Sequence, residues 1–250
     1  MSKPLRIVGG TQAEAVASVV ARIPAIADRY DVTHEHVEGG ETNALTVGGK
    51  TVTFPALRLE LLWPMTCANE NNRPEPGFPH GRFPYGDKFV SACLARDVPP
   101  QQILDLATNG TWGPNWPNLD EAFREESRRL TTGDATCDVK IGAHVLKRFR
   151  SQRLFWTVDH PTDALLSEVT KRLLSAAGLI AGPHVVDDAF SPSETEGVLG
   201  IYAVPIHPHV ASHFALAWYR PDQTYQAFDR SYSFREYFEA LIGSAAGVAG

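Results

Sequence analysis

The sequence contains few cysteines and no long apolar run. Its three cysteines, Cys67, Cys93 and Cys137, are widely spaced and form no Cys-x-x-Cys pair, which argues against a disulfide framework or a cysteine-ligated zinc site. A membrane-spanning helix needs about eighteen consecutive apolar residues, and we expect none. The first residues lead into a strand-like segment and not into an apolar signal core. These features predict a cytoplasmic protein.

Excess positive charge is also lacking. The chain has 23 Lys and Arg against 29 Asp and Glu, a formal net charge of −6. Sequence-independent binding of nucleic acid requires a basic surface, so we expect no nucleic-acid partner. One basic cluster, residues 147–153, carries four positive charges in seven residues, namely Lys147, Arg148, Arg150 and Arg153. It is either a solvated helix end or a source of cations for the phosphates of a ligand.

The composition is that of a folded chain, with 43% hydrophobic and 21% charged residues among 250. Strand-like runs alternate with amphipathic helical segments, so we predict one α/β domain over residues 1–250. Its central sheet is expected to be largely parallel, with flanking helices and helical and loop insertions. Strands are expected at 5–8, 30–33 and 198–205, a hairpin at 44–54, and helices at 13–23, 88–95, 100–107, 119–130, 141–149, 162–177 and 233–242.

Two strand-to-helix corners carry candidate functional residues. At the first, Leu5–Val8 leads into Gly9-Gly10-Thr11-Gln12 and a helix, whose first N–H groups could bind an anion or an oxyanion. This turn has neither the dinucleotide fingerprint nor a Walker A loop, and plain architecture is the alternative. At the second, Leu154–Val158 precedes Asp159, His160 and a helix. Sheet ends often carry chemistry, so His160 is a candidate base, although it could simply cap the helix.

A third candidate segment is the loop 79–88, which carries His80, Arg82, Tyr85, Asp87 and Lys88. Such a density of donors and acids on an irregular loop favours function over a rigid aromatic-proline loop. Histidines at 207, 209 and 213 invite a metal interpretation, but no glutamate completes an H-E-x-x-H motif. We therefore expect no bound metal.

Taken in order, these segments resemble the bacterial polysaccharide-biosynthesis acetyltransferase family typified by WcbI of capsule gene clusters. Residues 7–15 are similar to a G-N-C-Q-A opening, and residues 153–166 to an R-L-F-[YW]-T-x-N-H-P-T-N motif. Leu62–Pro64, Gly81–Asp87, Ile206–Val210 and Trp218-Tyr219 continue the resemblance. It implies binding of coenzyme A and transfer of an acetyl or related acyl group to a sugar hydroxyl.

The chain departs from this family pattern where the chemistry is expected. The family has a cysteine where this chain has Thr11, and asparagines where it has Gly10, Asp159 and Asp163. A threonine hydroxyl is a poor nucleophile without an adjacent base. Three alternatives follow. Thr11 is a nucleophile activated by a histidine, or it only binds while the acyl group passes directly from the thioester to the acceptor, or the chain has lost the family's activity.

Together these features predict a CoA-dependent acyltransferase acting on a hydroxyl or amine of a sugar or other small acceptor. His160 or His80 would be the general base, Asp159 or Asp87 would orient it, and the turn at Thr11 would supply oxyanion donors. Two alternatives stay open: an esterase resembling the SGNH class, with Thr11 as nucleophile, and a non-catalytic binder of coenzyme A or sugar. The residues expected to bind coenzyme A are Gly9, Gly10, Gln12, Arg82, Lys88, Arg148, Arg150 and Arg153.

Overall fold

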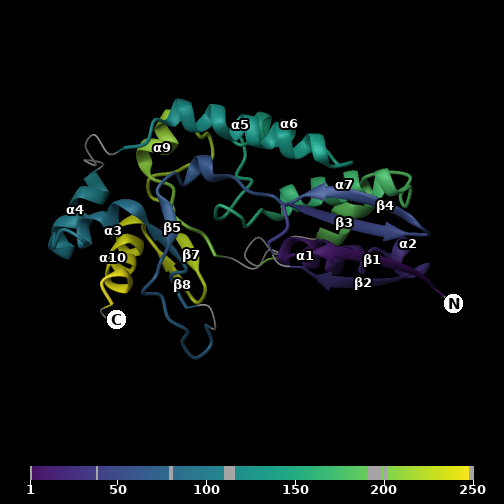
Figure 1. Cartoon of the computed structure of the whole chain (residues 1–250), viewed down its shortest axis with the longest axis horizontal. Coiled ribbons are helices and arrows are strands. Elements are labelled where there is room, and N and C mark those ends of the chain that lie inside the picture. Colours follow the sequence, from purple (N-terminus) through teal and green to yellow (C-terminus); the bar gives the residue numbers. More distant parts are fainter. Residues whose placement is uncertain are drawn as a thin grey trace. The chain divides into compact units, whose positions relative to one another are not determined.

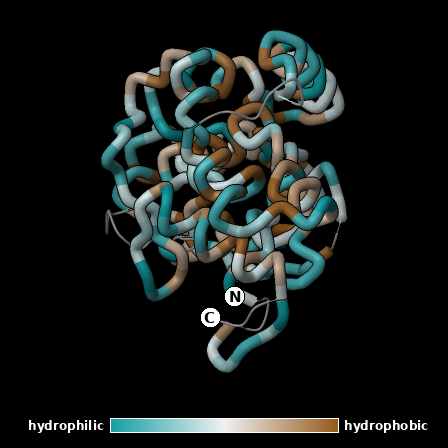
Figure 2. Tube along the Cα trace, turned by 90° about the vertical axis from the view of Figure 1, so that its left-hand side faces the viewer, coloured by the Kyte–Doolittle hydropathy of each residue, from teal (hydrophilic) through white to brown (hydrophobic). Residues whose placement is uncertain are grey.

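The chain forms two compact units in the computed structural model, which describes residues 2–37, 39–78, 81–109, 116–190, 199 and 202–247. Unit 1 comprises Met1–Arg58 and Glu125–Ile201, and unit 2 comprises Leu59–Arg124 and Tyr202–Gly250. Each unit contains helices and strands, so the chain is a mixed α/β protein (Figure 1). Hydrophobic and hydrophilic segments alternate along the trace (Figure 2), and most of the buried residues are hydrophobic. Among the described residues, the large hydrophobic side chains that are exposed are Val37 and Phe228.

Unit 1 is built on a mixed sheet with the strand order β2-β1-β3-β4. Its strands are β1 (Lys3–Gly9), β2 (Tyr30–His36), β3 (Thr42–Val47) and β4 (Lys50–Pro55). β1 pairs with β2 in parallel, but β1 with β3 and β3 with β4 are antiparallel. The prediction of a largely parallel sheet was therefore wrong. The predicted hairpin accounts for one of the two antiparallel pairings: Gly48 and Gly49, with φ of 56° and 80°, return the chain at once between β3 and β4, so no crossover helix can make these two strands parallel.

One face of this sheet packs against helices α1 (Thr11–Val20) and α7 (Asp163–Ala177). Alternate strand residues point to that face, and Leu5, Ile7 and Leu45 are completely buried there. Between them, Arg6 of β1 and Glu35 of β2 form an exposed ion pair at 3.1 Å. The period-2 pattern of the strands therefore decides which face the helices cover.

The predicted helix at 162–177 is confirmed as α7. Its apolar residues recur at helical spacing, and Leu165, Leu166 and Leu173 are buried. Gly178 ends the helix with φ of 73°, and the N–H of Leu179 donates to the Leu174 carbonyl at 2.9 Å. Unit 1 also contains α2 (Pro24–Ala27), α6 (Gly142–Arg148), α8 (His184–Asp187) and the 3₁₀ helix η3 (Asp188–Phe190).

Unit 2 places helices around two short hairpins, β5 (Thr66–Ala68) with β6 (Tyr85–Asp87) and β7 (Tyr225–Ala227) with β8 (Arg230–Tyr232). Its core includes Phe89, Ile103 and Tyr237, contributed by three helices. The helices are α3 (Lys88–Leu94), α4 (Pro100–Asn109), α9 (Pro208–His213), α10 (Phe234–Ala245) and the 3₁₀ helix η1 (Glu60–Leu62). α5 (Leu119–Thr136) begins within unit 2 and ends within unit 1.

Predicted helices were placed more accurately than predicted strands. Helices expected at 88–95, 100–107, 119–130, 141–149 and 233–242 are confirmed as α3, α4, α5, α6 and α10. The strand expected at 198–205 was wrong for its described part, where Tyr202 makes one isolated bridge to Ala227. Residues 198, 200 and 201 lie outside the described residues. A short apolar run fits a buried loop as well as a strand, which accounts for the error.

Gly9 at the end of β1 has no room for a side chain. Its φ is 149°, and a Cβ atom would lie 2.0 Å from Oδ1 of Asn43, which is only 4% exposed. We expect Gly9→Ala to lower the free energy of unfolding by about 1–3 kcal/mol, measured by urea denaturation. Gly10→Ala is the matched control, because Gly10 has φ of −77° and its Cβ would come no closer than 3.8 Å to Val37. Equal stability losses in the two variants would contradict this prediction.

Candidate functional site

The N-terminus of α1 is the first part of a candidate site in unit 1. Gly10 is the N-cap and contributes no side-chain hydrogen bond, and the first helical bond runs from the N–H of Glu14 to the Gly10 carbonyl at 3.1 Å. The N–H groups of Thr11, Gln12 and Ala13 therefore have no acceptor within the helix. Thr11 is exposed. The first turn of α1 thus offers backbone donors and a hydroxyl at the surface of the unit.

Gln12 ties this helix end to two distant segments. Its Nε2 donates to the carbonyls of Leu57 at 2.8 Å and Asp159 at 2.7 Å, and its Oε1 accepts from the N–H of Leu57 at 2.8 Å. Both N–H bonds of the amide are used within the protein. The sequence predicted that Gln12 binds coenzyme A. In the structure its side chain is hydrogen-bonded to the backbone of Leu57 and Asp159. The link brings the first turn of α1 and the turn containing His160 together.

The turn at His160 is held by a small hydrogen-bond network. Thr157 Oγ1 donates to Asp159 Oδ1 at 3.0 Å and lies 3.0 Å from His160 Nδ1. The same Asp159 oxygen lies 3.3 Å from His160 Nδ1. Because both atoms beside Nδ1 can accept, Nδ1 carries the ring proton and Nε2 carries the lone pair. A histidine in this tautomer, with its side chain 32% exposed, can act as a general base.

The segment before this turn differs from the predicted strand. Residues 154–158 are not part of the sheet; Phe155 makes one isolated bridge with Pro161, and the N–H of Trp156 donates to the His160 carbonyl at 2.8 Å. The expectation that His160 follows a sheet strand was therefore wrong. The run is apolar because Leu154 and Phe155 fill the core of unit 1, each 1% exposed. Thr162, not His160, is the N-cap of α7.

The predicted cations of unit 1 lie on the segment that leads to this turn. Lys147, Arg148 and Arg150 are exposed, and Arg153 is half-buried with its guanidinium 5.0 Å from the centre of the Trp156 ring. Arg150 lies similarly over Phe149, at 5.1 Å. These positive charges therefore precede the His160 turn directly, and they stand at the surface where a phosphate could reach them.

The other predicted site residues belong to unit 2. Arg82 pairs with Glu75 at 2.9 Å and Asp229 at 2.7 Å, and its guanidinium lies 3.8 Å from the centre of the Phe78 ring. Hydrogen bonding to Glu75 raises the pKa of Arg82. Its charge is thus already matched by two carboxylates, with which a phosphate would compete. Lys88 begins α3 and reaches the Pro64 carbonyl at 3.4 Å. His80 lies outside the described residues.

Asp87 is the N-cap of α3. One carboxyl oxygen, Oδ1, accepts from the N–H groups of Phe89 at 2.8 Å and Val90 at 3.0 Å. The residue is 9% exposed. Burial raises the pKa of this carboxyl from an ordinary 3.8 to about 6, although the two N–H donors act in the opposite direction. Asp87 therefore holds a hairpin-to-helix junction. Of the two carboxylates predicted to orient a base, Asp159 is the one that lies beside a described histidine.

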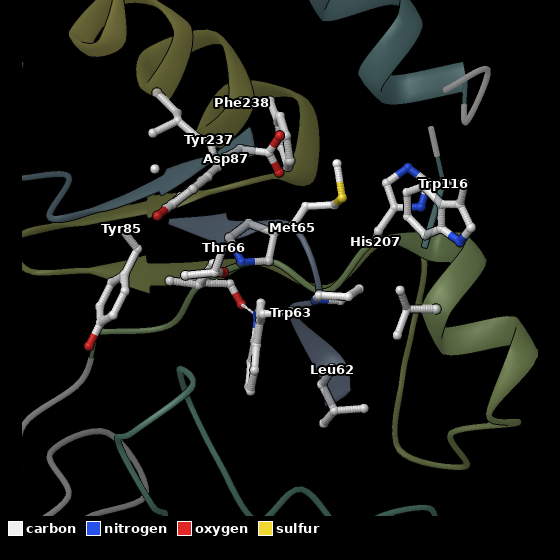
Figure 3. A pocket seen from close by; sticks show the side chains of 16 residues that line it. Leu62, Trp63, Met65, Thr66, Tyr85, Asp87, Trp116, His207, Tyr237 and Phe238 are labelled. Atoms are coloured by element: carbon white, nitrogen blue, oxygen red, sulfur yellow. Dashed lines mark hydrogen bonds between the residues drawn. The ribbon is translucent and has the colours of Figure 1, made fainter. Parts of the chain in front are cut away.

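A pocket in unit 2 lies beside Asp87 (Figure 3). Its empty volume is about 420 Å³, including space open to solvent. The lining is mostly apolar and aromatic, and includes Trp63, Met65, Tyr85, Trp116, His207, Tyr237 and Phe238. In the close-up, the Asp87 carboxyl group lies near Phe238 and points toward the Met65 side of the pocket. Sequence analysis did not find this pocket, because its walls come from segments more than a hundred residues apart.

His207 has a structural role in this pocket. Its Nδ1 accepts from the N–H of His209 at 3.1 Å, which caps α9, and its Nε2 lies 3.1 Å from the Ala107 carbonyl. Burial lowers the pKa of His207 from an ordinary 6.5 to about 4, so the ring is neutral near pH 7. His213 pairs instead with Asp120 at 3.1 Å. No group of three or more potential metal ligands occurs among the residues that the structure describes.

Comparison with known proteins shows which solved structure shares this fold. A solved structure of WcbI matches this chain with a TM-score of 0.69. WcbI is described as a novel polysaccharide biosynthesis enzyme, and the structure is of the native protein without a disulfide bond between coenzyme A and one of its cysteines. The match covers 98% of this chain and 90% of that chain at 17% sequence identity, which is evidence for a shared fold. No curated protein sequence matches the chain. In the described part of the chain, no helix is long and apolar enough to cross a membrane.

The class of protein is thus a mixed α/β protein with the fold of WcbI. The family model described as polysaccharide biosynthesis enzyme WcbI matches residues 23–181, more than half of the chain. The chain belongs to this family of polysaccharide biosynthesis enzymes, as the resemblance in its motifs predicted.

Proposed function

We propose that this protein transfers an acyl group from coenzyme A to a hydroxyl or amino group of a sugar or related small acceptor. The observation that carries the proposal is the link in unit 1 between the α1 N-terminus and the His160 turn. Gln12 joins them through its bond to the Asp159 carbonyl at 2.7 Å. Family membership supports a role in polysaccharide biosynthesis, and the coenzyme A named for the solved WcbI structure supports the choice of acyl donor.

His160 is the base in this reaction. Its Nε2 removes the proton of the acceptor hydroxyl or amine as the acceptor atom attacks the thioester carbonyl. The negative charge that develops on the carbonyl oxygen is stabilised by the first N–H groups of α1. The carbon–sulfur bond then breaks, and the departing thiolate takes the proton from Nε2 as free coenzyme A. Asp159, beside Nδ1 at 3.3 Å, stabilises the imidazolium that exists between these two transfers.

The side chain of Thr11 is not the nucleophile in this scheme. The hydrogen bonds that join the His160 ring to Thr157 and Asp159 support His160 as the base that removes the acceptor's proton. A direct transfer needs from this turn only its backbone donors. Binding of the phosphates of coenzyme A falls to the cations before the turn, Arg148 and Arg150 above all, because both are exposed and lie on the segment that leads to His160.

Coenzyme A binding tests the cation assignment. Coenzyme A at a hundred times its Kd should raise the free energy of unfolding by about 2.7 kcal/mol, seen as a higher Tm. The double variant Arg148→Gln/Arg150→Gln should bind more weakly and with less dependence on salt concentration. Arg22→Gln/Arg29→Gln is the matched control, because it removes two exposed positive charges that follow α1 and α2 and lie outside the segment before His160. Failure of the unmodified protein to bind coenzyme A would overturn the acyltransferase proposal.

The acceptor decides between a transferase and a hydrolase. A transferase should release free thiol from acetyl-CoA only when a suitable sugar is present, measured with a thiol reagent. The esterase alternative predicts saturable turnover of p-nitrophenyl acetate and thiol release at the same rate without any sugar. Saturable ester turnover with no response to sugars would favour the hydrolase.

A further inference from the structure

Several polar side chains that line the pocket of unit 2 are already hydrogen-bonded within the unit. The Trp63 indole N–H donates to the Val204 carbonyl at 3.0 Å. The Tyr237 hydroxyl lies 3.0 Å from that of Tyr202, and both nitrogens of His207 are engaged with backbone groups. These rings therefore present mainly their faces and edges to the pocket. The acidic group of this lining is the carboxyl group of Asp87.

Among the described residues, the hydrogen bonds of the Asp87 carboxyl group use only one of its two oxygens. Oδ1 caps α3, and no described residue donates a hydrogen bond to Oδ2 or places a cation within ion-pair distance of it. Lys88, its neighbour in sequence, reaches instead toward the Pro64 carbonyl. A nearly buried carboxylate without a counter-ion is costly, and the cost falls when a cation enters beside it.

We propose that this pocket binds a small organic ammonium group, with Asp87 as its counter-ion and the surrounding aromatic rings as its walls. Aromatic faces attract cations, and the attraction strengthens when both partners are desolvated. A purely apolar ligand would bury the carboxylate further without pairing it, and an anion would be repelled. The proposal rests on unit 2 alone and does not depend on acyl transfer.

Matched ligand pairs test the charge requirement. Choline and its neutral isostere 3,3-dimethyl-1-butanol, and likewise n-butylammonium and 1-butanol, would be titrated into the full chain by calorimetry at pH 7.5. We expect the ammonium of at least one pair to bind at least about tenfold more tightly than its neutral partner, because a charge-assisted contact replaces a neutral one. Choline carries a quaternary ammonium without an N–H, whereas n-butylammonium can donate an N–H to Oδ2. Comparing the two pairs therefore shows which kind of ammonium the pocket prefers. Equal affinities within both pairs, or no binding by either ammonium at 10 mM, would overturn the proposal.

Asp87→Asn separates the charge from the cap. The asparagine Oδ1 can still accept from the N–H groups of Phe89 and Val90, so the junction should fold, as a thermal unfolding curve would verify. This variant should lose the preference for the ammonium over its neutral isostere. Asp97→Asn is the matched control, because Asp97 is exposed and its φ of 56° suits asparagine. Retention of the preference in Asp87→Asn would contradict the assignment.

Acid should weaken ammonium binding as Asp87 takes up its proton. The other titratable or charged groups near it or in the same lining are Lys88 and Cys93 on α3, Cys67 on β5, Tyr85 on β6, Tyr237 on α10 and His207 before α9. Burial lowers the pKa of His207 to about 4, so its ring stays neutral down to about pH 5. Burial raises the pKa of both cysteines and of Tyr237, so these three stay neutral in acid, and Lys88 adds a fixed positive charge. Affinity should therefore fall as the pH drops below about 6. Affinity that is constant from pH 7.5 to 5 would count against Asp87 as the counter-ion.

Discussion

His160→Ala is expected to lower the kcat/KM of acyl transfer by about 10²- to 10⁴-fold, the loss typical of removing a general base. The variant should fold, because the ring is partly exposed and the hydrogen bonds that join it to Thr157 and Asp159 lie within its own turn. Thiol release from acetyl-CoA in the presence of a sugar acceptor measures the effect, and a Tm close to that of the unmodified protein excludes unfolding. Activity within about threefold of the unmodified protein would show that His160 is not the base.

Thr11 provides the contrast that separates direct transfer from a covalent mechanism. In direct transfer its backbone N–H acts but its hydroxyl does not, so Thr11→Ala should cost no more than about tenfold. In a covalent mechanism Thr11→Ala should cost several powers of ten, whereas Thr11→Ser should keep much of the activity. Intact mass spectrometry after incubation with acetyl-CoA would detect an acyl group on the threonine. Such an adduct would overturn direct transfer.

Helices were predictable from this sequence because their signals are local. The apolar residues of α7 recur within single turns, and Gly178 marks its end. Strand direction depends on long-range pairing: β1 pairs with both β2 and β3, and only the first pairing is parallel. The run before His160 shows the same limit. Its apolar residues are buried as expected, but in a loop, and composition does not distinguish a buried loop from a buried strand.

The sequence allowed candidate site residues to be named, but it did not reveal how they are connected. Thr11, Asp159 and His160 were found from their positions near predicted helix starts. Two further features depend on contacts that sequence spacing does not reveal. Gln12 bonds to Asp159, 147 positions away. Thr157, which lies beside both Asp159 and His160, looked like an ordinary strand residue, although a hydroxyl three positions before a histidine was the available signal.

Asp87→Asn is expected to stabilise the protein at pH 7 and above by about 3 kcal/mol. Burial raises the pKa of Asp87 from 3.8 to about 6, so the folded state holds this proton more tightly than the unfolded state does. Between those two values stability falls as pH rises, and a shift of about two units corresponds to about 3 kcal/mol. Asparagine keeps the cap without ionising. Urea denaturation at pH 7.5 measures the gain, and a less stable variant would show that the capping charge outweighs the burial.

His207 is expected to oppose Asp87 in acid. Burial lowers the pKa of this ring from 6.5 to about 4. Between these two values the unfolded state binds the proton and the folded state does not, so the free energy of unfolding decreases as the pH is lowered. The two contributions largely cancel between about pH 6 and 4 in the unmodified protein. In Asp87→Asn the His207 contribution acts alone. As the pH is lowered from about 6 to 4, the free energy of unfolding of this variant should therefore fall by up to about 3 kcal/mol more than that of the Asp97→Asn control. Parallel pH profiles for the two variants would show that these buried groups do not set the acid stability of unit 2.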